Sequence, residues 1–123
     1  MQHLFITSAD SQNLFPDNNG NKFTVELPTF LKGVKYVALL EFHCDSFFEP
    51  LFLFCDIVKS SYAVNSMLPI LRVVNTVGEV GNVMPVKTTR DDIIRITFTI
   101  TDLNLQVPAH DLGAVRLVLR VVQ

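Results

Sequence analysis

Two β-rich runs, Pro50-Leu-Phe-Leu-Phe-Cys-Asp-Ile-Val58 and Met67-Leu-Pro-Ile-Leu-Arg-Val-Val-Asn75, decide the fold of this chain. In the first run every odd position from 51 to 57 is apolar, and Phe52 and Phe54 add aromatic side chains at even positions. Because successive side chains of a strand point to opposite faces, both faces of this strand need cover. One face can serve the domain's own core. The other face must be covered by a second sheet, a crossing loop or another subunit.

Other runs alternate apolar and polar side chains with the two-residue period of a half-buried strand. The clearest run places four apolar side chains inward: Ile94, Ile96, Phe98 and Ile100. No helical period of 3.6 residues persists over three turns. We expect strands at residues 22–27, 34–42, 51–58, 68–74, 83–86, 93–101 and 115–121. The expected fold class is all-β: an antiparallel β-sandwich, as a single jelly roll of about eight short strands.

The chain divides into a short arm and one domain. Its 123 residues suffice for one domain with a proper core and are too few for two. The run 16–21, Pro-Asp-Asn-Asn-Gly-Asn, is a strong turn signal. We expect residues 1–20 to form an extended N-terminal arm, with a short strand at 3–8 as the open alternative, and residues 21–123 to form the jelly-roll domain. The arm is a candidate for strand addition to a neighbouring subunit.

The composition favours assembly over binding of nucleic acid or membrane. Hydrophobic residues make up 49% of the chain and charged residues only 18%. This composition predicts more apolar surface than a small monomer can bury in its own core. The net charge of -2 gives no basic field for phosphates. No apolar run is long enough to span a membrane, and the first ten residues lack the pattern of a signal peptide. We therefore expect a homo-oligomer made inside the cell, without membrane insertion and without nucleic acid.

Few residues offer chemistry. His43-Cys44-Asp45 are consecutive, and on a strand they would point to opposite faces, so they cannot converge on one metal without His3 or His110. Nothing near either cysteine marks it as an activated nucleophile, and no phosphate-binding glycine loop follows a strand. We expect no catalytic residue, no metal and no cofactor. The two cysteines are expected to be reduced and packed, with a bridge between them as the open alternative.

Short motifs follow one another along most of the chain in a distinctive order. They are Leu27-Pro28, Gly33 with Tyr36-Val-Ala-Leu39 and Glu41, Cys55-Asp-Ile-Val58, Pro69-x-Leu71-Arg-Val73, Pro85-Val86, Ile94-x-Ile96 to Asp102, and Leu117-x-Leu119-Arg120. In these motifs, over residues 20–121, the chain resembles the small penton-like or minor capsid single jelly-roll proteins of Maverick/Polinton elements, adintoviruses and related eukaryotic DNA viruses. The resemblance implies a non-enzymatic virion subunit, assembled in the host cell as a pentamer or trimer with other capsid proteins as partners.

A capsid subunit works by burying complementary area on its neighbours, with an apolar centre and a polar rim. Four phenylalanines are candidates for that centre, or alternatively ordinary core: Phe47, Phe48, Phe52 and Phe54. Three arginines are candidates for ion pairs between subunits, or alternatively solvated: Arg72, Arg116 and Arg120. Within the capsid class, the short chain also suits a cement subunit. Two other functions stay open: a trimeric spike or receptor- or glycan-binding head, and a small enzyme, against which the missing catalytic constellation argues.

Overall fold

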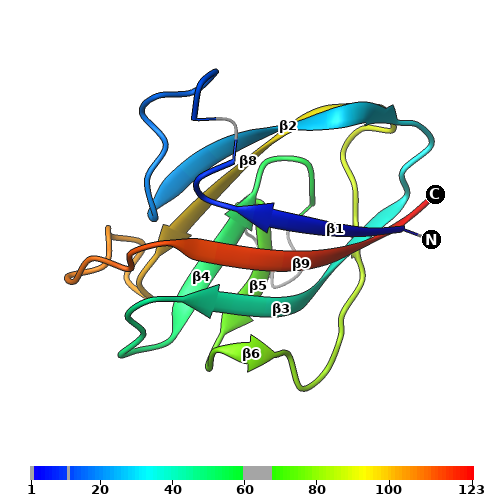
Figure 1. Cartoon of the computed structure of the whole chain (residues 1–123). Coiled ribbons are helices and arrows are strands. Elements are labelled where there is room, and N and C mark those ends of the chain that lie inside the picture. The colour runs from blue at the N-terminus through cyan, green and yellow to red at the C-terminus, as the bar shows by residue number, and fades with distance from the viewer. Residues whose placement is uncertain (1, 11, 60–67) are drawn as a thin grey trace.

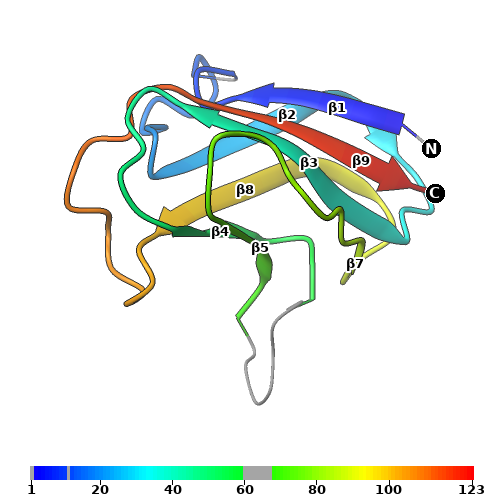
Figure 2. The same cartoon turned by 90° about the horizontal axis from the view of Figure 1, so that it is seen from below.

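The structure, a computed structural model, describes residues 2–10, 12–59 and 68–123. The strands are β1 (Gln2–Thr7), β2 (Lys22–Leu31), β3 (Tyr36–Cys44), β4 (Leu51–Cys55), β5 (Ile70–Val74), β6 (Gly78–Glu79), β7 (Val86–Lys87), β8 (Ile93–Thr101) and β9 (Val115–Val122). Sheet A has the order β1-β9-β3-β6, with β7 also paired to β3, and sheet B has the order β2-β8-β4-β5. The two antiparallel sheets pack face to face (Figures 1 and 2), and the described residues contain no helix. The expected all-β sandwich is confirmed.

The beginning of the chain is a paired strand rather than a free arm. β1 runs antiparallel to β9 along its whole length. Ile6 is buried in the core, and the Ser8 hydroxyl accepts a hydrogen bond from the backbone N–H of Val115 at 3.0 Å. The prediction of an extended arm over residues 1–20 is therefore wrong for its first part. Residues 2–7 form a strand there, close to the alternative prediction of a strand at 3–8. Its partner lies more than a hundred residues away in sequence, so local patterns cannot reveal the pairing.

The hydrophobic core lies between the sheets. β4 contributes its odd-numbered side chains, with Leu51, Leu53 and Cys55 fully buried. From β8, Ile96, Phe98 and Ile100 face inward as expected. Where β8 begins, Ile93 is buried and Ile94 only half-buried, which corrects the expected inward position of Ile94. The β2–β8 ladder changes register between Glu26 and Leu31, so the alternation does not continue unbroken to the start of β8.

A second register shift, between Leu39 and Glu41, changes which side chains of β3 face the core. Strict alternation would place Phe42 on the face opposite Val37 and Leu39. In the structure all three are buried at 1% exposure or less. An extra residue in one strand of an antiparallel pair inverts the alternation beyond it. Apolar side chains from both expected faces of β3 therefore reach one core.

Several strand boundaries also differ from the sequence pattern. β2 continues through Pro28, which was expected to end it, because β2 is an edge of sheet B and a proline there can leave its missing N–H on the open side. The two-residue strands β6 and β7 fall in the expected loop at 75–82 and directly after Pro85. The described residues thus hold nine strands, against about eight expected.

Candidate interaction surface

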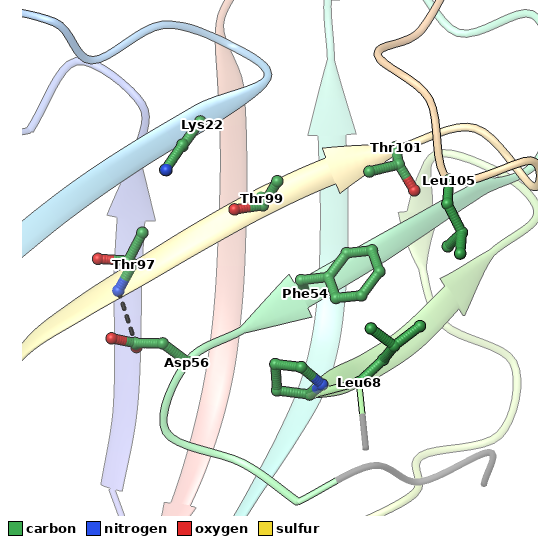
Figure 3. Close-up of a pocket in the computed structure, with 9 residues that line it drawn as sticks. Lys22, Phe54, Asp56, Leu68, Thr97, Thr99, Thr101 and Leu105 are labelled. Atoms are coloured by element: carbon green, nitrogen blue, oxygen red, sulfur yellow. Dashed lines mark hydrogen bonds between the residues drawn. The ribbon is translucent and has the colours of Figure 1, made fainter. Parts of the chain in front are cut away.

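An open groove of about 370 Å³ lies on the outer face of sheet B, away from the core (Figure 3). It is lined by residues of β2, β4 and β8 and of the segments that follow β4 and β8 and precede β5: Lys22, Phe54, Asp56, Leu68, Pro69, Thr97, Thr99, Thr101 and Leu105. Because the odd-numbered side chains of β4 fill the core, Phe52 and Phe54 must point outward. Figure 3 shows the Phe54 ring between Leu68 and the threonines of β8.

Strand pairing gives the two phenylalanines their neighbours. Phe54 lies opposite Thr99 of β8 on one side and opposite Ile70 of β5 on the other. The rings of Phe52 and Phe54 meet edge to face, with centroids 6.3 Å apart and planes at 68°. Such aromatic pairs are worth about 0.5–1.5 kcal/mol beyond the area that they bury. The outer face of sheet B therefore carries a rigid aromatic strip on β4.

The polar groups at one end of the groove are bonded within the chain. One carboxylate oxygen of Asp56 accepts the backbone N–H of Thr97 at 2.9 Å, and the other lies 3.7 Å from the guanidinium of Arg90. The hydroxyls of Thr24 and Thr97 lie 2.9 Å apart across β2 and β8. These contacts fix the rim of the groove and leave its floor apolar. An apolar floor with a few polar groups at the rim is the usual character of a binding groove.

The structure separates the four predicted interface phenylalanines. Phe52 and Phe54 share the outer face of sheet B, where both are half-buried. Phe47 is half-buried and packs against the core, which matches the alternative interpretation. Phe48 is 77% exposed in the loop between β3 and β4, and its ring meets that of His110 at 4.6 Å. Of the four rings, those of Phe52 and Phe54 contact each other.

The three predicted interface arginines lie elsewhere. Arg116 and Arg120 project from β9 on the outer face of sheet A, on the opposite side of the sandwich from the groove. The Nε of Arg120 is buried without a hydrogen-bond partner among the described residues. The guanidinium of Arg72 donates to the backbone carbonyl of Asn82. The seven candidate residues therefore do not share one face of the subunit.

The residues considered as metal ligands engage the chain itself. The imidazole Nε2 of His43 lies 3.1 Å from a carboxylate oxygen of Glu41, and Asp45 accepts the backbone N–H of Ala114 at 2.9 Å. Within residues 2–10, 12–59 and 68–123, no three His, Cys, Asp or Glu side chains are placed to hold a metal ion. Over the same residues there is no helix with the length and apolar character to cross a membrane.

Both cysteines are free thiols in the structure. Cys55 is fully buried at the end of β4, and this burial raises its pKa to about 12. Partial burial also raises the pKa of Cys44, which is half-buried beside the carbonyl of Ser46. A thiol with a raised pKa is a poor nucleophile, because the thiolate is the reactive form. Neither cysteine therefore suits covalent catalysis.

We predict that the Cys55 thiol makes the protein less stable as the pH rises above its unfolded pKa of about 8.5. Between that value and about 12 the unfolded chain loses the proton while the folded chain keeps it, so stability falls by up to about 1.4 kcal/mol per pH unit. Urea unfolding from about pH 8 to about pH 10.5 measures the slope. The matched control is Cys55→Ala, which should lose this part of the slope. Equal slopes for both proteins would refute the assignment.

In comparisons with protein-family models, with curated proteins and with solved structures, nothing matched this chain.

Proposed function

We propose that the protein is a non-enzymatic structural subunit of a virion, a single jelly roll that assembles with copies of itself and with other capsid proteins. The strand order supports the jelly roll, because the first strand pairs with the last and β1-β9-β3-β6 faces β2-β8-β4-β5. A jelly roll combines two Greek keys in two facing sheets, and this order agrees with that arrangement. The ordered motifs from Leu27-Pro28 to Leu117-x-Leu119-Arg120 support a penton-like, minor capsid or cement role.

The observation that carries the proposal is the aromatic strip on the outer face of sheet B. Outward positions of a sheet with one covered face are normally polar. β2 follows this rule with Lys22, Thr24 and Glu26, whereas β4 places Phe52 and Phe54 outward. Covering the strip with a second subunit would remove apolar surface from water. A standard interface takes about 800 Å² from each partner, which is a small part of the 6889 Å² accessible on this chain.

We predict that the double variant Phe52→Thr, Phe54→Thr is monomeric or associates at least about tenfold more weakly than the parent. Threonine keeps the β-propensity of strand β4 and removes the aromatic area. Light scattering behind a sizing column measures the mass, for which the monomer is 13.8 kDa.

A matched control separates this effect from a general loss of surface hydrophobicity. Phe30 and Phe48 are 59% and 77% exposed and lie outside the groove. The double variant Phe30→Thr, Phe48→Thr should therefore keep the mass of the parent. Circular dichroism checks that both double variants are folded. An unchanged mass for the β4 variant would show that sheet B is not the assembly surface.

A receptor- or glycan-binding head is the second candidate, and the groove favours it. Ligand sites are concave and mostly apolar, with a few polar groups that fix orientation. Here the Phe54 ring lies beside the hydroxyl-bearing side chains of Thr99 and Thr101. Specific binding to cell-surface glycans, lost in Phe54→Thr, would support this function for a trimer. Absence of glycan binding together with self-assembly would support the structural subunit.

A further inference from the structure

The edges of the two sheets differ in how well they resist pairing with another chain. Proteins protect open edges with charges, prolines, irregular register or very short strands. β2 carries Lys22, Glu26 and Pro28 and a register shift, and β5 carries Arg72 and a register shift against β4. β6 and β7 have two residues each. Within the described part of the chain, three edges are therefore protected.

β1 has none of these features. Its six residues, Gln-His-Leu-Phe-Ile-Thr, include no Asp, Glu, Lys, Arg or Pro, and its register against β9 is unbroken. Phe5, at its middle, is 76% exposed. Figure 2 shows β1 at the rim of sheet A, with β9 on one side of it. This edge is a template for strand addition.

The backbone groups that β1 offers can be identified. The N–H of Ser8 donates to the carbonyl of Val115 at 2.8 Å, which fixes the phase of the β1–β9 ladder. Hydrogen-bonded and non-hydrogen-bonded pairs alternate in an antiparallel ladder. Leu4 and Ile6 therefore bond to β9, whereas the N–H and C=O groups of His3 and Phe5 point away from it.

The end of the open edge is closed by the chain itself. Thr7 would also point outward, but its N–H donates to the carboxylate of Asp10 at 2.9 Å and its C=O accepts the N–H of Asp10 at 3.0 Å. His3 and Phe5 are then the β1 residues with open backbone groups on this edge. His3 and Phe5 both have open N–H and C=O groups, and they are two positions apart. An antiparallel copy of the same strand can form hydrogen bonds with both of them.

We propose that β1 pairs antiparallel with β1 of a second copy, with His3 of each copy opposite Phe5 of the other. Each of these two pairs exchanges two N–H···O bonds. Leu4 then lies on the two-fold axis opposite Leu4 of the second copy, and both half-buried leucines gain cover. The self-pairing brings no like charges together, because β1 carries no Lys, Arg, Asp or Glu. The inference rests on the proposed self-assembly, but it uses a different surface from the strip on β4.

The register predicts a specific cross-link. Non-hydrogen-bonded antiparallel pairs have Cα atoms about 4.5 Å apart, within the range that a disulfide spans. Leu4→Cys should therefore form a disulfide-linked dimer with oxidised glutathione, at least about tenfold more than the parent under the same conditions. Non-reducing electrophoresis measures the dimer. The parent controls for the native thiols, Cys44 and Cys55.

Three further variants keep this test decisive. Phe5→Cys should not cross-link, because residue 5 faces residue 3 of the second copy. Cross-linking by Phe5→Cys and not by Leu4→Cys would overturn the register.

A charge on the edge gives a second test. Adding Phe5→Lys to Leu4→Cys should abolish the cross-linked dimer, whereas adding Phe30→Lys, on β2, should leave the dimer in place. If Leu4→Cys fails to fold, Phe5→Lys alone should still weaken self-association. An unchanged mass in that variant would overturn the proposal.

The outcomes separate this inference from the proposed function. Self-association that depends on Phe52 and Phe54, without a Leu4→Cys cross-link, would overturn the β1 contact and leave the sheet B contact standing. A cross-link combined with indifference to the β4 substitutions would support the β1 contact and remove the evidence for assembly through sheet B. A monomer that forms no cross-link would overturn both.

Discussion

Replacing Phe98 by alanine is expected to lower the free energy of unfolding by about 3–5 kcal/mol. Phe98 lies at the centre of β8 with none of its surface exposed, and its ring stacks on that of Phe23 at 5.2 Å. The truncation removes apolar contact with both sheets and leaves a cavity that the surrounding strands cannot fill. Because a domain is typically stable by about 5–15 kcal/mol, this change takes a large share of the total. Urea unfolding followed by circular dichroism measures it.

The matched control for this change is Phe48→Ala. The same atoms are removed, but Phe48 is 77% exposed and its ring contacts that of His110. We expect a loss of about 1 kcal/mol or less. Equal losses for Phe98→Ala and Phe48→Ala would contradict the placement of the core between the two sheets.

Replacing Gly20 by alanine is expected to cost about 1–3 kcal/mol through overpacking. A Cβ at Gly20 would collide with the backbone carbonyl oxygen of Gly113, so a loop must move. The loop at Gly113 is held on both sides, because the N–H of Gly113 donates to Asp111 and the N–H of Ala114 donates to Asp45, each at 2.9 Å. Gly113 also has a φ of 71°, which a side chain would strain. Moving either loop to make room for the Cβ would therefore cost free energy.

Thermal unfolding compares Gly20→Ala with Gly81→Ala. No atom lies within 4 Å of a Cβ built at Gly81, and its φ is not positive. The control should therefore keep the melting temperature or raise it slightly, because alanine restricts the unfolded chain. A loss of 1 kcal/mol corresponds to about 4 °C for a domain of this size. Equal melting temperatures for the two variants would mean that the loops at Gly20 and Gly113 do not meet as described.

Local alternation was enough to predict most strands and both faces of β4. It predicted that one face of this strand serves the core and that the other needs further cover, without deciding which; the structure buries Leu51 and Leu53 and leaves Phe52 and Phe54 outward. It failed where register changes, because the extra residues of a bulge leave no mark in the apolar pattern. Phe42 and Ile93 are the examples, each buried beyond a register shift.

The candidate surface depends on pairings that no local pattern contains. The sequence pattern gave an alternating strand at 93–101 and named Phe52 and Phe54 as interface candidates, as separate predictions. Only the β4–β8 ladder places Phe54 opposite Thr99 and makes them neighbours in one groove. The pairing of β1 with β9 is equally non-local, and it turned the expected arm into an edge strand. Two of the arginines predicted to share an interface with the phenylalanines, Arg116 and Arg120, project from the other sheet, because β9 belongs to sheet A.

The central claim is that the outer apolar surface of this sandwich is covered by further copies of the chain. The solution mass of the purified protein, measured by light scattering at two widely separated concentrations, tests it most directly. We predict a mass of at least twice 13.8 kDa at both concentrations. A pentamer would favour a vertex role, a trimer a spike or cement role, and an even number of copies the two-fold β1 contact. A mass of 13.8 kDa at both concentrations would contradict the claim.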